Sequence, residues 1–160
     1  MSLGPISHAV EVDAPPQLAF DLFTQRLGSW WPLAYTFFGP DFADAAIDPT
    51  PGGRWFERNL QGQEVAWGEV RVYEPPHRLG LTFAIGADRK PTSPAHASQV
   101  EVRFDAVNSG TRVEVRHWHF EHHGDDAQAM RAGMDSAQGW PTILAELRRA
   151  AALIAARNHR

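Results

Sequence analysis

The feature that most constrains this chain is a change in hydrophobic period toward its C-terminus. Between residues 45 and 120, apolar side chains recur at every second position in short segments separated by turn signals. From about residue 130 to residue 156 they recur instead at three- and four-residue spacing, and one stripe contains Trp140, Ile143, Leu144, Leu147 and Ala151. The first pattern is typical of half-buried strands and the second of an amphipathic helix. We therefore expect one long C-terminal helix to be buried against a sheet.

The period-2 segments predict about seven strands, at residues 6–12, 45–48, 54–59, 64–73, 78–85, 98–106 and 111–120. Their connections are mostly turns, such as Pro51-Gly52-Gly53 and Asn108-Ser109-Gly110. Such connections are too short for parallel crossovers, so the sheet is predicted to be antiparallel. A run of strands followed by a helix indicates the α+β class, with a curved antiparallel sheet of six to seven strands around the C-terminal helix.

Two further helical features are predicted. An apolar stripe from Leu18 to Leu27 indicates a helix that begins after Asp13, a possible N-cap, and stops at Gly28. Pro141 lies inside the C-terminal pattern, so we expect either a kink there or a helix that begins near Gly139. Residues 29–40 are dense in aromatics without clear periodicity, and we interpret them as a loop-like cover.

Composition limits the function classes. The length of 160 residues fits one domain, with residues 1–5 and 157–160 expected as disordered ends. The absence of cysteine excludes disulfides and thiolate sites, and the net charge of −4 argues against a nucleic-acid partner. No apolar run approaches the roughly 20 residues of a membrane span, and the N-terminus lacks the pattern of a signal peptide. We therefore expect a cytoplasmic protein with no membrane partner and no cofactor.

The order of the predicted elements resembles the helix-grip fold of the START-like (SRPBCC) superfamily. More narrowly, the chain is similar to the bacterial group related to the C-terminal domain of the activator of the heat-shock-protein-90 ATPase. The resemblance spans about Ile6 to Leu153. The motifs that carry it are Pro51-Gly52-Gly53-Arg54, Gly68-Glu69-Val70, Glu74-Pro75-Pro76-His77-Arg78-Leu79, Val113-Glu114-Val115-Arg116-His117 and Gly139-Trp140.

This resemblance implies a cavity between the sheet and the last helix. It supplies no shared catalytic residues, because members of the superfamily include cyclases and lipid carriers as well as proteins without a known role. This chain differs from what we expect of the group in two segments that are richer in aromatic and imidazole side chains, Trp30-Trp31-Pro32 and His117-Trp118-His119.

The predicted ligand-binding residues are large aromatics and histidines that a curved sheet and a long helix would bring together. Ligand sites are concave and mostly apolar, with a few polar anchors. The same side chains could equally fill a solid core, since protein interiors pack with few voids. The predicted set is Trp30, Trp31, Tyr35, Phe38, Trp55, Trp67, Phe83, Phe104, His117, His119 and Trp140.

The polar candidates have alternative interpretations. His117 and His119 share one face of a predicted strand, a spacing that suits metal ligands, but no third ligand is defined and no metal site is predicted. Glu57, Glu69, Arg71 and Arg103 would be acid–base candidates inside a cavity. On the outer face they would form only weak cross-strand ion pairs, and the outer face is favoured because buried charges are costly.

Three functions remain open. The first, which we favour, is the binding of a small apolar molecule in the cavity. The second is a cyclase- or hydrolase-type enzyme, which requires His117 to open onto the cavity within reach of Tyr35, Glu57 or another polar group. The third is a chaperone-regulating interaction module, which requires an exposed apolar patch. A homodimer is left open as a further possibility.

Overall fold

The computed structural model describes residues 3–158, and within them one antiparallel sheet has the strand order β1-β7-β6-β5-β4-β3-β2. This confirms the predicted fold class and the strand count. The strands are β1 (Ile6–Val12), β2 (Phe42–Ile47), β3 (Arg54–Asn59), β4 (Glu64–Glu74), β5 (Arg78–Phe83), β6 (Ser98–Val107) and β7 (Gly110–Trp118). The α-helices are α1 (Pro16–Phe23), α2 (Ala127–Asp135) and α3 (Trp140–Asn158). Short 3-10 helices occupy Leu27–Ser29, Leu33–Tyr35, Gly39–Asp41, Pro94–His96 and Phe120–Asp126.

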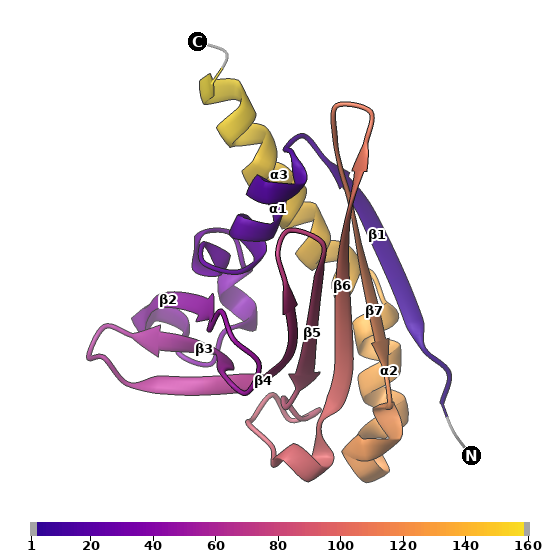
Figure 1. The fold of residues 1–160 in the computed structure, drawn as a ribbon. Helices are drawn as coiled ribbons and strands as arrows, with labels where there is room; N and C mark the ends of the chain where they lie inside the picture. Colours follow the sequence, from indigo (N-terminus) through magenta and orange to yellow (C-terminus); the bar gives the residue numbers. More distant parts are fainter. Residues whose placement is uncertain (1–2, 159–160) are drawn as a thin grey trace.

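The sheet curves because its register slips in three places. Irregularities interrupt the pairing of β2 with β3, of β3 with β4 and of β4 with β5. Such bulges bend a strand and increase its twist. As a result β2, β3 and β4 turn across the molecule relative to β5, β6 and β7, and α3 runs behind the concave side (Figure 1).

Strand alternation sets the two faces of the sheet as expected. Val102 of β6 pairs with Val115 of β7, and both are buried. The neighbouring outward residues form ion pairs, including Arg103 with Glu101 at 2.7 Å. The inner face is therefore closed by α1 and α3, while the outer face meets solvent.

The first helix is shorter than expected and is not capped by Asp13. Helix α1 has Pro15 at its N-cap and ends at Phe23. The Thr24 hydroxyl donates to the Phe20 carbonyl at 2.8 Å, which satisfies an acceptor at the helix end. Leu27 is buried, but it belongs to the 3-10 turn that follows α1. The apolar stripe therefore predicted the burial of Leu27 correctly, although the helix does not extend to it.

The long helix begins where Pro141 suggested. Helix α3 starts at Trp140, which places Pro141 in the first turn, where a missing N–H is tolerated. Gly139 is required before it, because a Cβ there would collide with the Met134 and Gly133 carbonyl groups. The predicted stripe of α3 is buried.

Contacts and helix bounds are described close to both ends of the chain. Arg157 and Asn158 belong to α3, and the Gly4 carbonyl accepts a hydrogen bond from Arg131 at 2.8 Å. Residues 1–2 and 159–160 lie outside the described residues. No helix within residues 3–158 combines the length and the apolar character needed to cross a bilayer.

Candidate functional site

A cavity of about 330 Å³ lies at one end of the α3 interface. It is bounded by α2, the start of α3, the end of β5 with the loop after it, and the segment from Trp31 to Phe37. Its lining consists of Trp31, Ala34, Tyr35, Thr36, Phe37, Phe83, Ile85, Gly86, Ala87, Arg89, Ala129, Met130, Gly133, Met134, Ser136, Gln138, Gly139 and Ile143. The volume is at the lower end of the range of about 300–1,000 Å³ typical of ligand sites.

The walls are mainly apolar, and two polar contacts join them at the edge. The Tyr35 hydroxyl donates to the Gln138 carbonyl at 2.6 Å, which ties the segment before β2 to the link between α2 and α3. The Arg89 guanidinium lies 6.0 Å from the centre of the Tyr35 ring. The first contact holds together two walls that are 103 residues apart in the sequence.

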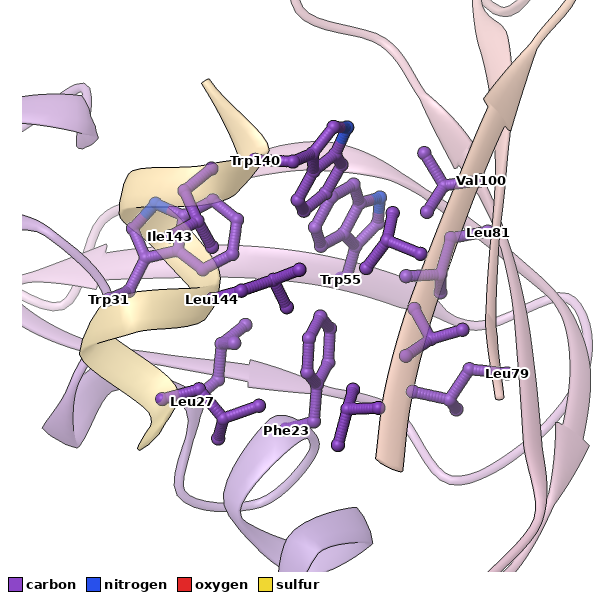
Figure 2. Close-up of a cluster of buried hydrophobic side chains, with 14 of the residues drawn as sticks. Phe23, Leu27, Trp31, Trp55, Leu79, Leu81, Val100, Trp140, Ile143 and Leu144 are labelled. Atoms are coloured by element: carbon purple, nitrogen blue, oxygen red, sulfur yellow. The ribbon is translucent and has the colours of Figure 1, made fainter. Parts of the chain in front are cut away.

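A cluster of tryptophans packs behind Trp31, the tryptophan that lines the cavity. The Trp31 ring lies 4.9 Å from that of Trp67, 6.2 Å from that of Trp55 and 6.4 Å from that of Trp140, measured between centroids. Figure 2 shows Trp31, Trp55 and Trp140 converging between β-strands and the first turns of α3. Edge-to-face and tilted pairs of this kind are favourable and rigid.

Most of these indoles have a hydrogen-bond acceptor. Trp30 donates to the Leu22 carbonyl at 2.7 Å and Trp55 to the Thr82 carbonyl at 2.7 Å. Trp67 donates to the Glu57 carboxylate at 2.8 Å. The buried indole nitrogen of Trp31 has no hydrogen-bond partner among the described residues.

Glu57 is fully buried, which corrects the expectation that it faces outward. Its carboxylate accepts hydrogen bonds from the backbone N–H groups of Phe37 at 2.7 Å and Phe38 at 3.1 Å, in addition to that from Trp67. Among the described residues, its hydrogen-bond donors are these three N–H groups, and none of them is cationic. Glu57 therefore fastens the aromatic segment to β3, and it does not line the cavity.

His117 is also fully buried and does not line the cavity. Its Nε2 lies 2.7 Å from the Ser98 hydroxyl, and its Nδ1 accepts a hydrogen bond from Trp140 at 3.1 Å. Burial lowers the pKa of His117 well below its ordinary value of 6.5, and the neighbouring His123 adds to this effect. The condition for a catalytic His117, access to the cavity, is not met.

His119 does not sit beside His117 as the spacing predicted. Strand β7 ends at Trp118, and His119 adopts a left-handed conformation with φ of 61°. Its exposed ring faces that of His122, with centroids 5.0 Å apart. Across residues 3–158, no group of three or more His, Cys, Asp or Glu side chains is arranged to hold a metal ion.

The remaining charged candidates lie on the outside, as expected. The side chains of Glu69 and Arg71 are 42% and 55% exposed and 3.8 Å apart, and Arg103 is 54% exposed. Exposed ion pairs of this kind contribute little to stability. They take no part in the cavity.

The structure brings three of the predicted ligand residues to the cavity: Trp31, Tyr35 and Phe83. Phe38 is half-buried beside the lining segment, and His119 is exposed. The others pack in the core behind the cavity and do not line it: Trp30, Trp55, Trp67, Phe104, His117 and Trp140.

Sequence reasoning missed the side of the cavity formed by α2 and by the loop after β5. Met130 and Met134 come from α2, whose helical spacing at residues 127–135 was a usable signal. Arg89 and Gln138 come from irregular segments and carry no such signal. Their position depends on how the loops pack.

Comparison with known proteins places the chain among related sequences and structures. The profile of the family described as "Activator of Hsp90 ATPase homolog 1-like protein" matches residues 13–152. No curated protein sequence matches significantly.

Three solved structures are similar to this one. Txn09, described as an anthrahydroquino-gamma-pyrone synthase complexed with SUM, is 32% identical, with 92% of this chain and 97% of that chain covered and a TM-score of 0.65. CalC from Micromonospora echinospora, described as a self-sacrificing resistance protein, is 28% identical, with 91% and 92% covered and a TM-score of 0.62. The Aha1 dimer from Colwellia psychrerythraea is 15% identical, with 93% and 96% covered and a TM-score of 0.57, a likeness of fold alone.

Proposed function

Because the chain belongs to the family of activator of Hsp90 ATPase homolog 1-like proteins, we propose that it binds a small, largely apolar aromatic molecule in the cavity between α2, α3 and residues 31–37. The observation that carries this proposal is the cavity itself. An interior that otherwise packs tightly around five buried tryptophans leaves about 330 Å³ open beside Trp31 and Phe83.

The shape and lining favour a compact ring system. Aromatic side chains and methionines supply broad apolar contact, and methionine adapts to varied ligand shapes. The named activity of Txn09, a synthase of an anthrahydroquino-gamma-pyrone, is consistent with a fused-ring ligand for a chain 32% identical to it.

Gly133 offers a direct test of where the ligand binds. It lines the cavity from α2, and a Cβ added there meets no atom within 4 Å. A Gly133→Phe variant should therefore fill the cavity without a backbone clash, while Gly133→Ala should leave most of it open. We would measure thermal stabilisation and calorimetric affinity against flavonoids, aromatic polyketides and fatty acids.

The proposal expects at least one aromatic compound to bind the wild type and Gly133→Ala, and to bind Gly133→Phe at least tenfold more weakly. Failure of every compound to bind the wild type would refute ligand binding. Equal binding to Gly133→Phe would place the ligand elsewhere.

An enzymatic role is the second candidate, and the synthase name of Txn09 favours it. Among the described lining residues, the ionisable side chains are Tyr35 and Arg89, so a reaction would depend on these two or on the ligand's own groups. Chromatography of a bound ligand after incubation distinguishes turnover from simple binding.

A chaperone-regulating role has weaker support. The exposed large apolar side chains among residues 3–158 are Leu33, Leu60 and Leu153, which lie in a 3-10 helix, in the turn between β3 and β4, and in α3. A pull-down that fails to enrich a chaperone would count against this role. Homodimerisation and a cytoplasmic location stay predictions, which analytical ultracentrifugation and cell fractionation test.

A further inference from the structure

The cavity has a buried apolar end and an exposed rim. Its buried end is lined by Trp31, Phe83, Met130 and Ile143, each at most 8% exposed; Trp31 and Ile143 are labelled in Figure 2. The exposed lining residues, which form the rim, are Ala34, Ala87, Arg89, Ala129, Gly133 and Gln138. A molecule that fills the cavity therefore meets apolar side chains inside and has its outer end at this rim.

Arg89 supplies the charge of the rim. The described lining residues include no Asp, Glu, Lys or His, so the guanidinium is the charged group among them. It lies over the ring of Tyr35, 6.0 Å from the ring centre, and Tyr35 lines the cavity from the segment before β2. The guanidinium thus extends from the loop after β5 to a second lining segment. Arg89 belongs to none of the ion pairs within residues 3–158.

The guanidinium also brings hydrogen-bond donors that its neighbours lack. The hydroxyls of Tyr35, Thr36 and Ser136 already donate to backbone carbonyls. A guanidinium has five N–H donors in a planar fork. The carboxylate of Asp88, in the same turn, accepts a hydrogen bond from the backbone N–H of Lys90 at 3.0 Å. The rim therefore presents a cationic donor group to a ligand.

The backbone of Arg89 adopts a conformation that suits glycine better. Its φ is 61°, in the left-handed region that residues with a Cβ rarely occupy. Two hydrogen bonds hold the turn: the Gly86 N–H donates to the Lys90 carbonyl at 2.8 Å, and the Arg89 N–H donates to the Gly86 carbonyl at 2.9 Å. Such strained positions cluster at ligand sites. An arginine at this position favours a role for its side chain beyond forming the turn.

We infer that the cavity takes aromatic acids, whose ring fills the apolar end and whose carboxylate or phenolate oxygen binds the guanidinium of Arg89. This inference rests on the proposed function and names its ligand class. A guanidinium and a carboxylate can form two parallel charge-assisted hydrogen bonds, which are stronger than neutral ones. A neutral ring system lacks this contact, and Arg89 repels a cationic amine.

The test compares 2-naphthoate with 2-naphthamide, which share one ring system and nearly one shape and differ in charge at neutral pH. Without a cation in the site, partial burial of the carboxylate is costly and the amide binds at least as tightly. With Arg89, we expect 2-naphthoate to bind the wild type about tenfold more tightly by calorimetry in low salt. Because salt screens exposed charges, this preference should shrink in about 0.5 M sodium chloride.

Variants of one turn assign the preference to Arg89. Arg89→Gln should abolish the preference for 2-naphthoate. Lys90→Gln is the matched control, because it removes the adjacent exposed cation, which does not line the cavity, and it should keep the preference. Arg89→Gly also lacks the guanidinium and adopts a φ of 61° without strain, so it should fold and lose the preference as well.

The outcomes separate this inference from the proposed function. Tighter binding of 2-naphthamide by the wild type, or a preference that persists in Arg89→Gln and Arg89→Gly, would overturn the inference and leave ligand binding intact. Failure of 2-naphthoate to bind a protein that binds another compound of the Gly133→Phe experiment would do the same. Absence of binding by both probes and by all those compounds would overturn the proposed function as well.

Discussion

The indole of Trp140 at the start of α3 donates a hydrogen bond to Nδ1 of His117 on β7, over 3.1 Å. An indole N–H can only donate, so Nδ1 must be unprotonated and the proton of the neutral imidazole lies on Nε2. Nε2 then donates to the Ser98 hydroxyl at 2.7 Å, and Ser98 is free to donate to Nε2 of His123 at 2.8 Å. A fixed chain of hydrogen bonds therefore links the helix, two strands and the turn after β7.

This chain predicts that stability falls in mild acid. The pKa values of His117 and His123 are lowered in the folded state, mainly by burial. The unfolded chain therefore takes up protons below about pH 6.5 that the folded chain does not, so the free energy of unfolding rises with pH across this range. Chemical denaturation at pH 7.5 and 5.5 should show a loss of up to about 1.4 kcal/mol per pH unit for each histidine. A flat profile, or the same slope in His117→Asn, would contradict the assignment.

Replacement of Glu57 by glutamine should loosen the aromatic segment that forms one wall of the cavity. Glutamine keeps one acceptor oxygen but turns an amide donor toward the N–H groups of Phe37 or Phe38. We expect a loss of about 2–3 kcal/mol in unfolding free energy and weaker ligand binding. Glu69→Gln, at an exposed site, is the matched control and should stay within about 0.5 kcal/mol of wild type.

Two tryptophan-to-phenylalanine substitutions should differ in cost because only one loses a hydrogen bond. Trp55→Phe removes the bond to the Thr82 carbonyl, whereas the Trp31 N–H has no partner to lose among the described residues. Since the change of volume is the same, Trp55→Phe should be about 1 kcal/mol more destabilising in urea titrations of ligand-free protein. Equal costs would show that the Trp31 N–H is satisfied in solution.

Gly68 should tolerate no side chain. A Cβ there would collide with the Thr82 carbonyl and with the Trp55 indole nitrogen, which are hydrogen-bonded to each other across the glycine. We expect Gly68→Ala to cost about 3 kcal/mol or more. Gly133→Ala is the opposite case: its Cβ meets open space in α2, and it should stabilise the protein by about 0.5–1 kcal/mol. The midpoint of thermal unfolding distinguishes the two.

Part of the candidate site was within reach of sequence reasoning, and particular residues show where it failed. Glu57 is in phase with Trp55 on β3, so its inward position was readable from period 2, although the cost of a buried charge argued otherwise. In the structure, N–H groups of Phe37, Phe38 and Trp67 donate hydrogen bonds to the Glu57 carboxylate and so lower the cost of burying it. A local sequence pattern does not reveal these donors, because they come from other segments of the chain. His119 was misplaced because the strand ends one residue before it.

The sequence by itself determined the α+β class, the antiparallel character of the sheet and the long helix with its buried stripe, because periodicity and turns act locally. Only the tertiary structure decided which aromatics border open space and which fill the core. A cavity is the volume left after all side chains have packed, so its walls depend on bulges, loop positions and helix docking together. For the same reason the indole N–H of Trp30 has a hydrogen-bond acceptor among the described residues, whereas the indole N–H of Trp31, the next residue, has none there.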